Sequence, residues 1–83
     1  MTWTVVWHPD ATNKLAEIWL QAADRAAVVR ATHDIDRTLG DRPELSGVEF
    51  YGDRLLDVAP LSVVYCFSEP DRLVKILDVT DLG

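Results

Sequence analysis

Few residues of this 83-residue chain are of the types that commonly carry out chemistry, and their spacing keeps them apart. His8 precedes a proline and His33 falls in an expected helix, and neither has a cysteine or carboxylate at the spacing of a metal site. Cys66 is expected to be a small buried thiol rather than a nucleophile, because its sequence neighbours include no basic group to activate it. The sequence therefore predicts no metal site and no cofactor.

Arg54 and Tyr65 are harder to assign. The Arg54 guanidinium could form a salt bridge with Asp57 or Asp78, or it could bind a phosphate or a target protein. The residues alone leave both interpretations open. Alternation along a strand places the Tyr65 ring among apolar side chains, which favours a core position with the hydroxyl bonded at the rim.

The elements that position these residues can be read from hydrophobic periodicity and turn signals. Two helices and four strands are expected, over residues 2–7, 11–22, 25–39, 54–58, 61–68 and 73–79, in the order β-α-α-β-β-β. The last three strands are joined by short turns, so they must form an antiparallel meander. This order predicts a two-layer α+β fold in which a helix hairpin packs on one face of a mainly antiparallel four-stranded sheet. The sequence does not fix the position of the first strand in this sheet.

Each expected helix has an apolar stripe at helical spacing and a polar face opposite it. The apolar stripes comprise Ala11, Leu15, Ile18, Trp19 and Ala22 in the first helix, and Val28, Ala31, Ile35 and Leu39 in the second. Asp24 is a suitable N-cap for the second helix, and Gly40 a suitable residue to end it. Arg30, Asp34 and Arg37 share the polar face, where Arg30 and Asp34 are spaced to pair. This face is either simply solvated or a docking surface for a partner.

Composition and charge narrow the classes of function. With 48% apolar and 27% charged residues the chain is expected to fold as one globular domain, residues 1–83. No apolar run approaches the roughly 20 residues of a membrane-spanning helix, and the single cysteine fits a reducing cytoplasm. The formal net charge of −6 argues against direct nucleic-acid binding, which requires a basic surface.

Several short strings follow one another along the chain: VWHPDA (6–11), LAEIW (15–19), IDRTL (35–39) before Pro43, GDRL (52–55), PLSVVY (60–65) and a valine-containing last strand. Their order and spacing resemble the RelE/ParE superfamily of toxins from type II toxin–antitoxin systems, also called the plasmid stabilisation family. The resemblance covers nearly the whole chain and implies the same two-layer fold.

The resemblance also bears on mechanism, because the superfamily contains two kinds of toxin. RelE-like members cleave mRNA on the ribosome, which requires a base, an acid and cations beside the scissile phosphate. By this resemblance Arg54 and Tyr65 are the candidate catalytic residues. However, Leu56 and Ser62 stand where such nucleases carry basic side chains, and the tail at 80–83 lacks both an arginine and a tyrosine or histidine. ParE-like members lack this set and bind DNA gyrase.

The leading hypothesis is a bacterial type II toxin that inhibits growth by binding a target, either DNA gyrase or the ribosome, rather than by catalysis. The resemblance implies a cognate antitoxin that lays a flexible segment over the toxin, as a helix in a groove or as an added strand. We expect this segment to be basic and apolar, and Arg30, Arg37 and Arg54 to contact a partner. Two alternatives remain, a ribosome-dependent mRNA endoribonuclease that uses Arg54, and a non-toxic, decayed toxin acting as a protein-interaction module.

Overall fold

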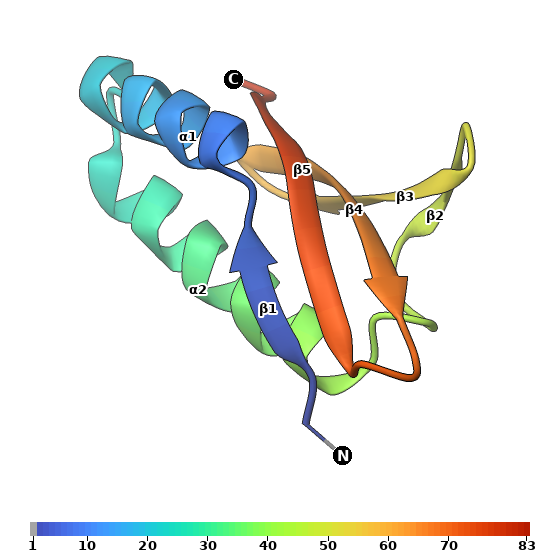
Figure 1. Cartoon of the computed structure of the whole chain (residues 1–83). Coiled ribbons are helices and arrows are strands. Elements are labelled where there is room, and N and C mark those ends of the chain that lie inside the picture. Colours follow the sequence, from blue (N-terminus) through green and yellow to red (C-terminus); the bar gives the residue numbers. More distant parts are fainter. Residues whose placement is uncertain (1) are drawn as a thin grey trace.

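Two helices cover one face of a five-stranded sheet in the computed structural model, which describes residues 2–83 (Figure 1). The helices are α1 (Pro9–Gln21) and α2 (Arg25–Asp41). The strands are β1 (Thr4–Trp7), β2 (Val48–Phe50), β3 (Asp53–Val58), β4 (Leu61–Ser68) and β5 (Leu73–Asp81). The predicted two-layer α+β architecture is confirmed, but the prediction of four strands is wrong because it missed β2.

The sheet order is β1-β5-β4-β3-β2, and all neighbouring strands are antiparallel except β1 and β5, which are parallel. The first strand therefore lies at one edge of the sheet, which the sequence had left open. A parallel position is possible because the two helices carry the chain back across the sheet before the meander begins. Neither helix of the described residues is both long and apolar enough to cross a membrane.

Local chemistry explains where the helices begin and end. The His8 Nδ1 atom accepts a hydrogen bond from the Asp10 amide (3.1 Å) at the start of α1, and Pro9 occupies the first turn. The Asp24 carboxylate accepts from the Ala27 amide (3.0 Å) at the start of α2, which confirms the predicted N-cap. The second helix continues to Asp41, two residues beyond the expected end, and the Gly40 carbonyl accepts a hydrogen bond from the Trp3 amide (2.8 Å).

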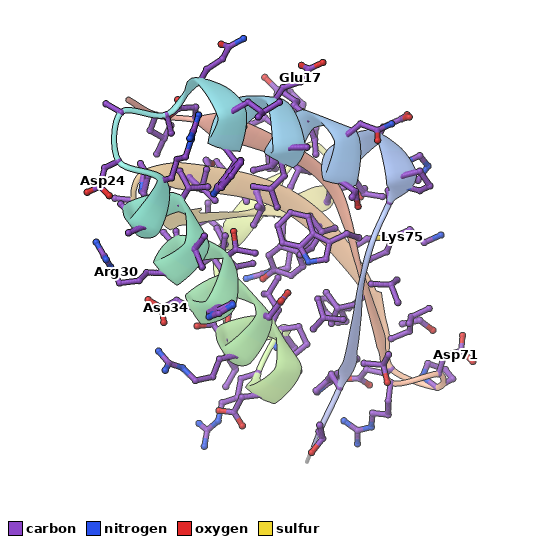
Figure 2. The ribbon with its side chains drawn as sticks, turned by 90° about the vertical axis from the view of Figure 1, so that its left-hand side faces the viewer. Glu17, Asp24, Arg30, Asp34, Asp71 and Lys75 are labelled. Carbon is purple, nitrogen blue, oxygen red and sulfur yellow. The ribbon has the colours of Figure 1, made fainter. Side chains whose placement is uncertain are left out.

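The core lies between the helices and the inner face of the sheet. It is formed by one side of each helix and of every strand except β2, with Trp3, Ala11, Val28, Ala31, Ile35, Leu39, Leu61, Val63, Tyr65, Val74, Ile76 and Val79 buried and Leu56 and Val58 of β3 packed against them. The predicted stripe of α2 is buried as expected, whereas Trp19 of the α1 stripe remains 39% exposed. The helices diverge from their short link near Asp24 (Figure 2), and Trp19 lines the groove that opens between them.

The missed strand β2 forms a tight hairpin with β3. Phe50 pairs with Asp53, and the two residues between them both have positive φ, 51° at Tyr51 and 88° at Gly52. Positive φ at both central positions is the pattern of a type I′ turn, whose twist matches the twist of the paired strands. Because the three residues of β2 are all exposed, the strand has no buried alternation by which it could be recognised.

Candidate functional site

Arg54 and Tyr65 are cross-strand neighbours on β3 and β4 and bond to the same loop. The Arg54 Nε and Nη2 atoms donate to the carbonyl oxygens of Ser46 (2.9 Å) and Gly47 (3.1 Å). The Tyr65 hydroxyl lies between the carbonyl oxygens of Pro43 (2.8 Å) and Ser46 (2.5 Å) and donates its proton to them. The two side chains therefore fasten the connection between α2 and β2 to the sheet.

The salt bridge between Arg54 and Asp57 or Asp78, one of the two interpretations that the sequence left open, does not form. The Asp57 carboxylate accepts from the Ser62 hydroxyl (2.6 Å), and the Asp78 carboxylate pairs with Lys14 of α1 (3.1 Å). The loop carbonyl oxygens accept hydrogen bonds from the guanidinium instead, because they lie on the inner side of β3, toward which the Arg54 side chain points. A fork of N–H donors suits two adjacent carbonyl oxygens as well as it suits a carboxylate.

The surroundings of Tyr65 favour a structural role. Its side chain is completely buried, and burial raises the pKa of the phenol above its ordinary value of 10.0. The nearby Arg54 guanidinium lowers this pKa and the Glu44 carboxylate raises it, but burial is the largest effect. The phenol therefore stays protonated at neutral pH and acts as a hydrogen-bond donor. A general base at this position would need the opposite shift and access to the 2′-hydroxyl of an RNA.

The outer face of the sheet, opposite the helices, is mainly apolar and acidic. Leu55, Val64 and Leu77 lie half-buried across its centre, and Asp53 and Asp57 lie on the same face of β3. Among the strand residues that the structure describes, this face has one cation, Lys75, which points away from the helices (Figure 2). One ammonium group beside two carboxylates is a poor environment for an RNA phosphate.

A groove of about 450 Å³ separates the two helices on the side away from the sheet. It is lined mainly by apolar side chains, Thr12, Leu15, Ala16, Trp19, Val28, Val29, Thr32 and His33. At its closed end the Arg25 guanidinium lies 4.7 Å from the centre of the Trp19 ring, and its Nε and Nη2 atoms donate to the Trp19 and Leu20 carbonyl oxygens (3.0 and 2.9 Å). A shallow apolar trough between two helices is a suitable seat for the apolar face of a third helix.

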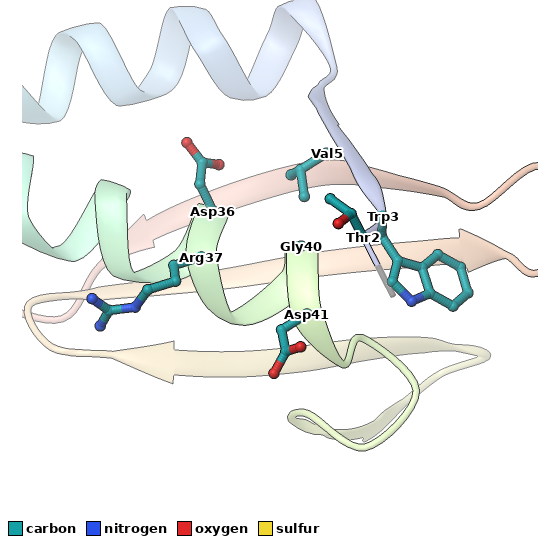
Figure 3. A pocket seen from close by; sticks show the side chains of 7 residues that line it. All are labelled: Thr2, Trp3, Val5, Asp36, Arg37, Gly40 and Asp41. Carbon is teal, nitrogen blue, oxygen red and sulfur yellow. The ribbon is translucent and has the colours of Figure 1, made fainter.

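The other two arginines expected to bind a partner lie on α2, away from Arg54. Arg30 and Asp34 both point outward from the helix (Figure 2), but Asp34 accepts from Arg37 (2.8 Å) rather than from Arg30 as expected. Arg37 also borders an open pocket of about 580 Å³ between α2 and β1. Its guanidinium points away from Thr2 and Trp3 on the other side of this pocket (Figure 3). The three arginines thus do not form one cluster.

Comparison with known proteins gives matches in structure alone. No family model matches the chain, and no curated protein sequence matches it. The RelBE2 toxin–antitoxin complex of Mycobacterium tuberculosis contains a chain with a TM-score of 0.77 and 14% identity, over 98% of this chain and 92% of that chain. A chain of the archaeal RelE–RelB complex of Pyrococcus horikoshii has a TM-score of 0.71 and 20% identity, over 100% and 98%. A chain of the chromosomal ParDE system of P. aeruginosa has a TM-score of 0.64 and 17% identity, over 99% and 98%.

The RelE/ParE fold is confirmed. Within it, two positions that the resemblance assigns to basic nuclease side chains have other surroundings here. Leu56 packs against the core, and Ser62 is buried with its hydroxyl on the Asp57 carboxylate. The RelE/ParE fold of this chain therefore presents no group of cations on the described strands.

Sequence reasoning missed one exposed feature of this RelE/ParE fold, the aromatic tip of the β2–β3 hairpin. Tyr51 is 93% exposed, and its ring packs edge-on against Phe50 at 4.9 Å. The string FYGD carries a turn signal, since glycine beside aspartate between apolar residues is typical of a hairpin. The tyrosine in place of the usual asparagine obscured it.

Proposed function

We propose that this chain is the toxin of a bacterial type II toxin–antitoxin pair, acting in the cytoplasm and neutralised by a cognate antitoxin. The observation that carries the proposal is the match of 98–100% of the chain to chains of the RelBE2 toxin–antitoxin complex, the archaeal RelE–RelB complex and the chromosomal ParDE TA system. The order and spacing of the sequence strings support it independently, because that resemblance depends on the residues and not on the structure.

We propose further that the toxin acts by binding its target, DNA gyrase or the translation machinery, and not by cleaving RNA. Arg54 and Tyr65 support this, since both are bonded to loop carbonyls and Tyr65 is fully buried. The acidic net charge of −6 and the single lysine on the outer face of the described strands also favour binding over cleavage of RNA.

The groove between α1 and α2 is the surface that we assign to the antitoxin. An amphipathic helix would place its apolar side chains against Leu15, Trp19 and Val29, which form the walls of the groove. Because the toxin is acidic, we expect basic residues on the antitoxin segment. Its affinity should then fall when salt is raised from about 0.1 M to about 1 M.

Inducible expression of the chain, alone and together with the gene next to it, tests this function. We expect growth arrest with the chain alone, rescue by the neighbouring gene, and no codon-phased mRNA 5′ ends during the arrest. Phased cuts would instead support a ribosome-dependent endoribonuclease. Normal growth without any antitoxin would support a non-toxic interaction module.

A matched pair of substitutions tests the groove. Ala16→Arg places a long charged side chain in the groove from an exposed position of α1. We expect this variant to arrest growth as the parent does but to escape the antitoxin. Glu17→Arg, on the outward side of the same helix (Figure 2), should remain neutralised. Equal neutralisation of both variants would show that the antitoxin docks elsewhere.

A further inference from the structure

The β2–β3 hairpin tip, residues 48–53, which we call the finger, extends beyond the rest of the sheet (Figure 1). Its apolar side chains are left open to solvent, with Val48 61% and Tyr51 93% exposed. By strand register Val48 and Phe50 share the outer face of the sheet with Leu55, so the finger continues the apolar centre of that face. Such continuous exposed apolar surface is typical of an interaction site.

The backbone conformation at the tip is one in which a tyrosine such as Tyr51 is rarely found. At φ 51° it occupies the left-handed region, which is costly for a bulky side chain and suits asparagine or glycine far better. The ring has Phe50 as its aromatic neighbour and is 93% exposed, and among the described residues no hydrogen bond of the hydroxyl ties it to the rest of the fold. The core gains nothing from this ring. A strained and fully exposed aromatic residue is better explained by a contact outside the molecule.

Resting on the proposed function, we propose that the finger is the element that docks on the toxin's cellular target, a protein with an apolar pocket rimmed by basic side chains. Tyr51 would fill this pocket, as a large and rigid side chain at the centre of an interface does. Glu49 and Asp53 flank the tip and supply the charge that a basic rim would complement.

A nucleic acid is the less favoured occupant, although exposed aromatic rings also stack on bases. Stacking sites of that kind lie in basic grooves, whereas this tip is flanked by two carboxylates. The nearest arginine in sequence, Arg54, is directed to the Ser46 and Gly47 carbonyl oxygens. The finger therefore lacks the cations that would hold a phosphate backbone.

The target, rather than the antitoxin, is assigned to the finger because of its place in the fold. The groove between α1 and α2 lies in the helical layer, while the finger extends the opposite face of the sheet. The two surfaces can accordingly be changed separately by mutation.

The test is Tyr51→Asn, which removes the ring and supplies the residue that the turn favours. We expect the melting temperature to be unchanged or higher and the purified variant to bind the antitoxin as the parent does. The amount of induced protein needed to arrest growth should rise roughly tenfold or more, as for the loss of a central interface residue. Leu82→Asn, at another exposed apolar residue near the C-terminus, is the matched control and should arrest growth like the parent.

The outcomes distinguish a failure of the proposed role of the finger from a failure of the proposed function. Arrest by Tyr51→Asn at the parent's dose would refute the docking role of the finger and leave the proposed function intact. A fall in the melting temperature of this variant would show that Tyr51 has a structural role. Retention of radiolabelled poly(U) by the parent but not by Tyr51→Asn would replace the protein target with a nucleic acid. Absence of arrest by the parent overturns the proposed function and the finger's target together. Undiminished arrest by Glu49→Gln would refute a basic rim.

Discussion

Replacing Tyr65 with phenylalanine distinguishes a structural hydroxyl from a catalytic one. The ring and its burial are preserved, and only the oxygen that lies between the Pro43 and Ser46 carbonyl oxygens is lost. We expect a clear loss of stability and no specific loss of growth arrest at temperatures where the variant is folded. A catalytic phenol would give the opposite result.

The size of the stability loss follows from what remains at the two carbonyls. The Ser46 carbonyl oxygen still accepts from Arg54 (2.9 Å), and the Pro43 carbonyl oxygen still accepts from the Ser46 amide (3.4 Å). Neither is left without a donor, so the loss should lie near the net value of one hydrogen bond plus part of a desolvation penalty, about 1.5 kcal/mol. For a domain of this size that corresponds to a fall in melting temperature of roughly 6–12 °C.

Urea unfolding followed by tryptophan fluorescence measures this change, and an unchanged m-value would show that the unfolded state is comparable. Tyr51→Phe is the control, since it removes the hydroxyl of an exposed tyrosine and should alter the free energy of unfolding by less than about 0.5 kcal/mol. An unchanged midpoint for Tyr65→Phe, together with lost growth arrest, would refute the structural assignment and return Tyr65 to a catalytic role.

Three further predictions concern the same loop. The raised pKa of Tyr65 means that the folded state holds this proton more tightly, so its contribution to stability is complete below pH 10.0 and is lost as pH rises through the folded pKa. Urea unfolding between about pH 9 and about pH 11 should therefore show a decline in the parent that is smaller in Tyr65→Phe. Gly47→Ala should cost more than about 3 kcal/mol in the same assay, because φ is +64° and the new Cβ would collide with a backbone carbonyl, whereas Gly52→Ala, with open space around it, should cost about 1–2 kcal/mol. Arg54→Lys should lower the unfolding free energy by about 1 kcal/mol, because one ammonium group does not reproduce two directed N–H donors, and full stability with lost growth arrest would contradict this.

The sequence was sufficient for the helical layer and for most of the sheet. Periodic residues such as Ile35 and Leu39 predicted the buried face of α2, and Asp24 predicted its start, because amphipathic spacing and capping are local properties. The strand β2 was not predicted because no local pattern of its own marks it. Its three residues are exposed, and it is held by pairing with β3 rather than by a pattern of its own.

The candidate site was less predictable than the fold. Strand alternation placed Arg54 and Tyr65 on one face of the sheet, and the cross-strand pair agrees with this. Their partners, however, are main-chain carbonyls of a loop, and a sequence does not reveal where the carbonyls of an irregular segment will point. The hairpin tip was overlooked because a turn in the left-handed region is expected to carry asparagine or glycine, and Tyr51 departs from that expectation.

The loop contacts also explain how this fold can keep an arginine and a tyrosine without the remainder of a nuclease site. The connection after α2 has neither helix nor strand to satisfy its carbonyl groups, and buried carbonyls without donors are costly. Arg54 and Tyr65 supply these donors from paired positions on β3 and β4, so they stabilise the fold independently of any activity of the chain. Ser62 and Leu56 do not contribute to holding this loop, because the Ser62 hydroxyl bonds to Asp57 and Leu56 packs against the core. The two positions that the resemblance assigns to basic nuclease side chains can therefore hold a buried serine and a core leucine without loss of the bonds that fasten the loop.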